Sequence, residues 1–573
     1  MPLPLEDYAL IGDTQSAALV GKDGSIDWLC WPRFDSDACF AALLGDASHG
    51  RWLLAPVGNI RKVTRRYRPG SLVLETDFET DYGSVRVVDC MPPRGSEPDV
   101  VRMVQGLSGT VPMRMELSVR FGYGDRTPWL RFGDNHVAAK AGPDGVALHT
   151  PVPLRRGSAV LTADFPVNPK ERVPFVLSWF PSNQPVPRAI DGLTAADDTE
   201  AWWKEWSSRL PAATPWSEHV QRSLITLKAL TYSPTGGIVA APTTSLPGGA
   251  GGDARYCWLR DATLALQALL DAGYLDEARA WRDWLVLAVA GEPEELQTVY
   301  GVAGERRLPE QDLPWLPGYE GHAPVRIGRR AERKLHFETH GEVMDCFHEA
   351  ERLGLPPSGD LWSLQKALLE HLEGAWKRPP EGRPTTLSGV MAWVAVDRTL
   401  ASAARFGLDA PVERWKALRA DIHAEVCREG FDGNRNTFVQ EYGGRGLDAQ
   451  LLRIPLVGFL PPEDARVRGT VEVIERELGE GDFVRRDSAR DSGISLPCSF
   501  WLADCLQLIG RREEAQTLFE RLLLVRNDVG LLPEEYSPQR RRGMGAFPHT
   551  SSHVALVHTA MSFARRQMAA SRR

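Results

Sequence analysis

The chain has 573 residues, of which 43% are hydrophobic and 25% charged, and its formal net charge is −8. This composition is typical of a soluble globular protein, and the length predicts at least two domains. The negative charge disfavours nucleic acid or an anionic membrane surface as the main partner.

The cysteines and the first residues predict a cytoplasmic protein. The eight cysteines form no CxxC pair and no zinc-like spacing with histidine, so we expect free thiols. The start, MPLPLEDYALIGD, lacks the basic head and apolar run of a signal peptide, and no segment reaches the roughly 18 apolar residues that cross a bilayer. We expect no cofactor and no metal, and an oligomer remains possible.

Residues 1–195 are predicted to form an antiparallel β-sandwich domain. Within 114–120, apolar side chains alternate with charged or polar ones, which indicates a half-buried strand. Residues 72–78 and 85–90 show a similar pattern. Glycine and proline interrupt this half at short intervals, as they do between the strands of a sandwich.

Helices are predicted from this point to the end of the chain. Residues 196–215 form a linker helix with a cluster of tryptophans, and residues 216–573 form the second domain. Here a helical segment repeatedly ends at a glycine and another helix follows, because glycine suits the left-handed position after a helix. The pattern recurs at Gly273, Gly354, Gly407 and Gly510. A stacked solenoid and a closed toroid both fit it.

Long loops that carry aromatic and charged residues interrupt the helices, and such loops often form sites. The 18 tryptophans pack into cores in the simplest interpretation, but tryptophan rings also stack on sugars. One loop, with Trp315, Tyr319 and His322, is a predicted wall of a substrate site.

A short segment, Tyr256–Asp261, stands at the start of an apolar helix. An aspartate at a helix start is often only an N-cap. In the functional interpretation, Arg260 and Asp261 bind sugar hydroxyls through charge-assisted hydrogen bonds, with Trp258 beside them.

Two adjacent acids, Glu534 and Glu535, follow a proline in a second loop. Adjacent acids in loops are usually only solvated. Inverting glycoside hydrolysis, however, needs two separate carboxyls roughly 6.5–9.5 Å apart, one as acid and one as base. Glu534 is a reasonable base.

A third candidate group contains His340 and Glu342, with Glu338 and His336 nearby. Glutamate and histidine at helical spacing can bind metal, but a second close pair of ligands is missing. We therefore include His340 and Glu342 among the candidate substrate-binding residues.

Six segments in fixed order resemble glycoside hydrolase family 15, in particular its bacterial glucoamylase- and trehalase-like branch. The resemblance covers nearly the whole chain. The segments are GSIDWLCWPRFDS (24–36), LTYSPTGGIVAAPTTSLP (230–247), YCWLRDATLAL (256–266), VMAWVAVDR (390–398), CSFWL (498–502) and GLLPEEYSP (530–538).

The resemblance implies a multi-domain α+β protein, in which an N-terminal β-sandwich precedes an (α/α)6 barrel. This selects the toroid over the solenoid. It also implies inverting hydrolysis of α-glucosides such as trehalose or a short α-glucan. Arg260 and Asp261 would hold the glucosyl unit, and Glu534 would be the general base.

The general acid departs from the family pattern. The family has Gly-x-Trp-Glu about a dozen residues before Ser-Lys-Val-Met-Ala-Trp. In this chain Lys377 follows Trp376 where the first motif has its glutamate, and Gly389 stands where the second motif has its lysine. We expect Trp376 to bind substrate and Lys377 to stand in the place of the acid. Glu373 or Glu381 could supply the carboxyl instead.

Further departures lie in the same loops. Arg329 replaces the usual asparagine, His340 replaces the usual tyrosine, and the C-terminal motif reads Ala546–His553. Three hypotheses follow: hydrolysis of a small α-glucoside, a non-hydrolytic elimination, isomerisation or cyclisation of a polyol-like substrate, and sugar binding without turnover.

Overall fold

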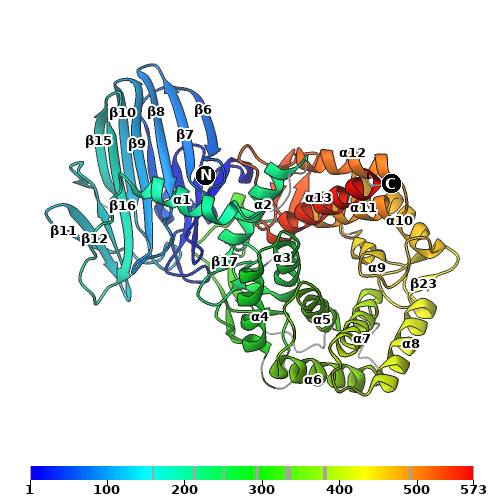
Figure 1. Cartoon of the computed structure of the whole chain (residues 1–573). Coiled ribbons are helices and arrows are strands. Elements are labelled where there is room, and N and C mark those ends of the chain that lie inside the picture. The colour runs from blue at the N-terminus through cyan, green and yellow to red at the C-terminus, as the bar shows by residue number, and fades with distance from the viewer. Residues whose placement is uncertain are drawn as a thin grey trace.

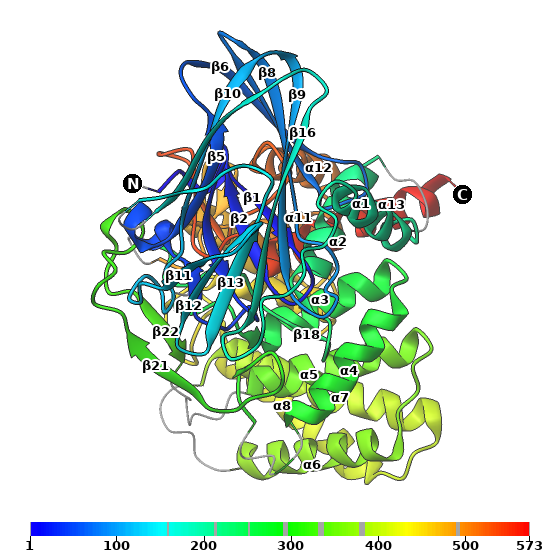
Figure 2. The same ribbon diagram turned by 90° about the vertical axis from the view of Figure 1, so that its left-hand side faces the viewer.

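The computed structural model describes residues 2–157, 160–210, 215–249, 252–289, 291, 296–329, 337–377, 384–488 and 493–571, with side chains up to residue 566. A β-sandwich stands beside a ring of helices (Figure 1). This confirms the predicted fold class, including the toroid. In the turned view of Figure 2, the sandwich covers one side of the helical domain.

Two eight-stranded antiparallel sheets make up the sandwich. The first has the order β1-β2-β3-β5-β10-β15-β14, with β4 paired to β3, and the second has the order β11-β12-β13-β16-β9-β8-β7-β6. The first sheet consists of β1 (Tyr8–Gly12), β2 (Ala17–Gly21), β3 (Ser25–Cys30), β4 (Ala38–Phe40), β5 (Arg51–Pro56), β10 (Val111–Ser118), β14 (Arg155–Arg156) and β15 (Leu161–Val167). The second consists of β6 (Ile60–Tyr67), β7 (Leu74–Thr80), β8 (Gly83–Cys90), β9 (Asp99–Gly109), β11 (Trp129–Phe132), β12 (His136–Ala141), β13 (Asp144–His149) and β16 (Arg172–Pro181).

Strand β10 shows why the sequence alternates in this half. Met113 and Met115 are fully buried between the sheets, whereas Arg114 between them is exposed. Met115 lies opposite Leu54 of β5 and Ala163 of β15, so its side chain packs within a layer of apolar neighbours. The predicted half-buried strand is therefore confirmed.

Helices make up most of the second half. They are α1 (Ala195–Ser207), α2 (Ser217–Ala229), α3 (Leu259–Asp271), α4 (Leu275–Val289), α5 (Phe337–Arg352), α6 (Gly359–Trp376), α7 (Thr386–Phe406), α8 (Val412–Glu429), α9 (Arg453–Leu456), α10 (Ala465–Leu478), α11 (Leu496–Leu508), α12 (Arg512–Leu523) and α13 (Thr550–Ser571). Short 3-10 helices are η1 (Leu5–Asp7), η2 (Ala42–Leu44), η3 (Ala47–His49), η5 (Tyr319–Gly321) and η6 (Ala449–Leu452).

These helices form two concentric rings. The inner ring runs α3, α5, α7, η6 with α9, α11 and α13, and α13 packs back against α3. The outer helices α4, α6, α8, α10 and α12 lie outside their inner neighbours, and α2 packs on α13 (Figure 1). The ring therefore closes between the start and the end of the helical domain.

Glycines end the helices as expected. Gly407 follows α7 with φ +63 and ψ 36, in the left-handed region, and its amide donates to the carbonyl of Ala403. Such a residue reverses the chain after a helix without the steric cost that a side chain brings.

Short strands pair into small antiparallel sheets in the loops between the helices. They are β17 (Thr231–Tyr232), β18 (Gly237–Ile238), β19 (Cys257–Trp258), β20 (Val299–Tyr300), β21 (Leu308–Asp312), β22 (Arg326–Arg329), β23 (Phe431–Asp432), β24 (Thr437–Phe438), β25 (Gly479–Glu480), β26 (Phe483–Val484), β27 (Ile494–Ser495), β28 (Glu535–Ser537) and β29 (Arg542–Met544). The last group, β27-β28-β29, forms a small three-stranded sheet.

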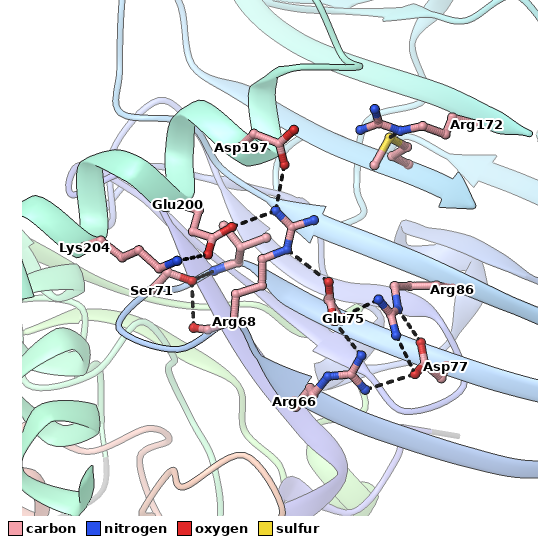
Figure 3. A network of polar contacts seen from close by, with 12 residues as sticks. Arg66, Arg68, Ser71, Glu75, Asp77, Arg86, Arg172, Asp197, Glu200 and Lys204 are labelled. Atoms are coloured by element: carbon pink, nitrogen blue, oxygen red, sulfur yellow. Dashed lines mark hydrogen bonds and ion pairs between the residues drawn. The ribbon is translucent and has the colours of Figure 1, made fainter. Parts of the chain in front are cut away.

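An ion-pair network ties α1 to the second sheet of the sandwich (Figure 3). Arg68, just after β6, donates to Glu75 at 3.0 Å and to Asp197 and Glu200 of α1 at 2.9 Å each. Glu75 also contacts Arg66 and Arg86. Because Arg68 is only 17% exposed, water screens these contacts less than it screens ordinary surface pairs.

All eight cysteines are free thiols, and seven are buried, as the sequence predicts. None of the described helices is long and apolar enough to cross a membrane. Within the described ranges, no three His, Cys, Asp or Glu side chains form a group that could hold a metal ion.

Candidate active site

A cavity of about 330 Å³ lies among the loops of the helical domain. Four stretches of chain line it, within 240–261, 440–450, 486–501 and 534–551. Its charged lining residues are Arg260, Asp261, Asp448, Arg486, Asp487, Glu534 and Glu535, and Trp258, Gln450, Trp501, His549 and Ser551 lie among them. The volume is near the lower end of the range for small-molecule sites, roughly 300–1,000 Å³.

The start of α3 brings Arg260 and Asp261 into this cavity. Asp261 is not the N-cap, which is Trp258, but lies in the first turn, and its buried carboxylate accepts a hydrogen bond from the Ser551 hydroxyl of α13. Arg260 donates to the side-chain oxygen of Gln450 at 3.2 Å and lies 3.7 Å from Asp261. This cation and anion, held side by side at a cavity wall, are suited to bind the hydroxyls of a polyol.

The carboxylate of Glu534 is enclosed by backbone. The amide of Ala546 donates to Oε2 at 3.1 Å, and the backbone amide of Glu534 donates to the carbonyl of Ala546 at 3.0 Å. Gly249 and Gly545 approach the same carboxyl so closely that a Cβ on either would lie under 3.0 Å from Oε2. Glycine at these positions therefore makes room for the acid.

Glu535 lines the same cavity but has a different environment. It is 5% exposed and accepts a hydrogen bond from the amide of Gly493 at 3.1 Å. Burial raises the pKa of Glu535 above its ordinary value, and the charge of Glu534 adds to the rise. The two adjacent carboxyls are thus not equivalent.

The indole of Trp258 faces the cavity and is braced from behind. The guanidinium of Arg329, from β22, stacks over the ring at 4.3 Å, and the indole N–H donates to the carbonyl of Asp253 at 3.4 Å. Arg329, which replaces the usual family asparagine, therefore supports a predicted sugar-binding residue.

The structure adds residues that motif reading missed. Asp448, at the start of η6, accepts from the backbone and side-chain amides of Gln450 at 2.8 and 3.1 Å. Burial raises the pKa of Asp448, although nearby Arg486 acts in the opposite direction. The imidazole of His549 hydrogen-bonds Ser552 at 3.1 Å. The sequence does show that these charged residues stand in loops between helices. It contains no local pattern that shows that these loops meet at one cavity.

Lys377 and Trp376 are not among the described residues that line the cavity. The Lys377 side chain is 66% exposed and pairs with Glu373 of the same helix at 2.8 Å. Trp376 packs against Phe337, with ring centroids 5.5 Å apart. Glu373 is engaged by Arg414 as well, at 3.2 Å, whereas Glu381 lies outside the described residues.

Glu342 and His340 lie on α5 and are not among the described residues that line the cavity. Glu342 is buried and pairs with Arg453 at 3.1 Å. Burial raises the pKa of Glu342 to about 6, although Arg453 and Arg260 oppose the rise. His340 is buried against His371, with ring centroids 5.8 Å apart.

Three predicted wall residues also lie away from the cavity. Trp315 donates to the carbonyl of Tyr123 in the sandwich at 3.0 Å, and the hydroxyl of Tyr319 donates to the carbonyl of Leu3 at 3.0 Å. His322 is exposed. Trp315 and Tyr319 therefore join the two domains in this structure.

Comparison with known proteins agrees with this geometry. The model described as glycosyl hydrolases family 15 matches residues 215–492, and the model described as trehalase-like, N-terminal, matches residues 1–178. A protein of Mycobacterium tuberculosis named Trehalase is 36% identical to this chain, and the alignment covers 97% of this chain and 89% of that protein. The chain belongs to glycosyl hydrolase family 15.

Other relatives extend the same assignment. A Trehalase of Thermoplasma volcanium is 29% identical, with 97% of this chain and 93% of that protein covered. The crystal structure of a bacterial glucoamylase complexed with acarbose superposes with a TM-score of 0.74 at 10% identity, covering 98% of this chain and 94% of that one, and it shows the common fold. This family 15 member is a glycosidase of the glucoamylase- and trehalase-like kind.

Proposed function

We propose that this family 15 member hydrolyses trehalose or a similarly small α-glucoside with inversion, and that Glu534 is the general base. One observation carries the proposal: the backbone-held carboxylate of Glu534 shares a cavity of about 330 Å³ with Arg260, Asp261 and Trp258. The relatives named Trehalase support the substrate class.

The proposed reaction begins with sugar binding. Arg260 and Asp261 hold hydroxyls of the glucosyl unit, and Trp258 offers an aromatic face to its apolar side. Glu534 accepts a proton from a water molecule while the water oxygen attacks the anomeric carbon. The bond from that carbon to the glycosidic oxygen breaks, and the oxygen leaves with a proton.

The proposed proton donor is Asp448 rather than Lys377. Lys377 is mostly exposed and ion-paired away from the cavity, whereas Asp448 lines it. Burial raises the pKa of Asp448, which favours the protonated form that a general acid requires. Glu535 also has a raised pKa, but it is the next residue in the chain after the proposed base Glu534.

An NMR time course tests the base and the stereochemistry. Trehalose, maltose and an aryl α-glucoside are each incubated with the wild-type protein and with Glu534→Gln. We expect β-glucose as the first product and no product from the variant. Binding of sugars without any turnover by the wild type would contradict the proposal and favour a sugar-binding protein.

A leaving-group comparison tests the donor. Asp448→Asn should lose about 10²–10⁴-fold in the rate with trehalose, whose leaving oxygen needs a proton. The same variant should retain most of its rate with an aryl α-glucoside that has an acidic leaving group. Equal losses on both substrates would assign Asp448 a structural role through η6.

A further inference from the structure

The β-sandwich contacts the cavity loops through a buried cluster of polar side chains. At its centre is Arg255, four residues before the start of α3 and between the cavity-lining residues Ala254 and Trp258. Arg255 and Asp253 are both 0% exposed, and they form a bidentate pair with distances of 2.9 and 2.6 Å. This pair stiffens the loop from within.

The remaining contacts of Arg255 cross to the sandwich. Its Nη1 donates to the hydroxyl of Tyr123 at 2.8 Å and to the carbonyl of Ser36 at 2.9 Å. Nη1 also lies 3.4 Å from the sulfur of Cys30. A buried guanidinium requires such acceptors, because leaving its donors unsatisfied is costly.

The backbone around Tyr123 is strained in a way that presents this side chain. Tyr123 has φ +58, a left-handed conformation that is uncommon for a bulky residue, and its neighbours Gly122 and Gly124 also have positive φ. The ring is 2% exposed and lies 6.5 Å from the ring of Trp28. Strain of this kind persists where the surrounding contacts hold it, and it clusters at functional sites.

Asp253 contacts three segments that line or support the cavity wall. Its Oδ2 accepts from the amide of Gly328 at 3.0 Å, next to Arg329, which braces Trp258. Its carbonyl accepts from the indole of Trp258 at 3.4 Å. It also bridges through its backbone to Thr244, another lining residue.

We propose that the β-sandwich helps to position the cavity wall. Tyr123 is a positioning residue that holds the Gly252–Trp258 loop in place through Arg255 and Asp253. Trp28 adds a second attachment, because its indole N–H donates to the carbonyl of Pro242 at 2.6 Å. The sandwich thus contacts two segments of the cavity wall, one beside Pro242 and one at Arg255. Only the kinetic part of the test rests on the proposed function.

The test compares two removals of a buried tyrosine hydroxyl. Tyr123→Phe deletes one of the acceptors of Arg255 in the sandwich and keeps the ring. Tyr67→Phe is the matched control, because the Tyr67 hydroxyl is also buried in the sandwich, and within the described part of the chain its hydrogen bonds go to the backbone of Leu10. For each variant we measure kcat/KM with trehalose, the urea midpoint, and amide hydrogen exchange across residues 252–258.

We expect Tyr123→Phe to lower kcat/KM by about tenfold and Arg255→Lys, which keeps the charge but not the fork, by about a hundredfold. Amide exchange across residues 252–258 should be faster in Tyr123→Phe and in Arg255→Lys. Tyr67→Phe should change neither kcat/KM nor this exchange, although its urea midpoint should fall by about as much as that of Tyr123→Phe. The inference would be overturned if amide exchange in this loop were as slow in Tyr123→Phe as in the wild type. It would also be overturned if Tyr123→Phe and Tyr67→Phe lost equal amounts of kcat/KM. If the wild type hydrolyses nothing, the proposed function fails, while exchange and trehalose affinity still decide the positioning role.

Discussion

Replacing Gly249 by alanine tests how closely the loops fit around Glu534, the proposed general base. A Cβ at this position would lie 2.1 Å from Oε2, 2.4 Å from Cδ and 2.6 Å from Oε1 of Glu534. Real Cβ atoms essentially never approach another atom closer than 3.0 Å, so the carboxylate must move by about 1 Å. The backbone also resists, because Gly249 has φ +68, where a side chain costs about 1–2 kcal/mol.

The displacement should act mainly on kcat. A reacting group misplaced by about 1 Å can cost about a hundredfold in rate, so we expect a loss of that size for Gly249→Ala with trehalose. KM should change less than kcat, because the proposed sugar-binding residues Arg260 and Asp261 lie on a different element, α3. Steady-state kinetics by coupled glucose detection gives both parameters.

Gly407→Ala is the matched control. Gly407 has φ +63, so alanine there carries the same backbone cost, but no atom lies within 4 Å of the added Cβ. Both variants should lose similar free energy of unfolding in urea, and only Gly249→Ala should lose activity. If the two variants had kcat values within about threefold of each other, the packing of this loop on Glu534 would not control the base.

Three further predictions concern the rest of the chain. Burial raises the pKa of Asp504 to about 7, so the folded state favours the protonated carboxyl. The stability that this protonated carboxyl contributes is complete near pH 4 and is lost as pH rises through 7. Asp504→Asn should therefore match the wild type near pH 4 and exceed it at pH 8 by on the order of 3–4 kcal/mol in urea unfolding. Arg68→Ala, which breaks the network in Figure 3, should cost about 2 kcal/mol of unfolding free energy, whereas Arg61→Ala at an exposed pair should cost under about 1 kcal/mol. Equal costs would show that burial of the network adds nothing. Lys377→Ala should keep kcat/KM for trehalose within about twofold, because this mostly exposed lysine pairs with Glu373 and does not line the cavity among the described residues, and a larger loss would return it to the catalytic site.

Local patterns predicted the elements of this fold, and long-range contacts decided their arrangement. The alternation along β10 required a half-buried strand, and Gly407 marked a helix end, because both depend on a few neighbouring residues. Closure of the ring depends on the packing of α13 against α2 and α3, which periodicity does not encode. For that reason the family resemblance, and not the helix pattern, separated the toroid from the solenoid.

The residues of the candidate site also fall into two groups, those that local motifs predicted and those that only long-range contacts revealed. Glu534, Arg260 and Asp261 lie in contiguous motifs, and the structure brings them to one cavity. Ser551 and Gln450 escaped notice because their partners, Asp261 and Arg260, lie 290 and 190 residues away. Lys377 matches the family position of the acid in sequence, but it follows an outer helix, and its ammonium turns to Glu373. Sequence position alone does not fix that direction.

The closing of the helical ring has a consequence for biosynthesis. Asp261 is made early in the helical domain, but the hydroxyl that holds it belongs to Ser551, and the base Glu534 is also made late. A nascent chain that has not yet extended α13 leaves the apolar faces of α2 and α3 uncovered and the cavity open on one side. Since domains fold as units during synthesis, the sandwich can complete its two sheets on the ribosome while the barrel waits for the last helix. A chain that ends before α13 should consequently bind no sugar and be degraded, even though it contains every residue of the Arg255 attachment.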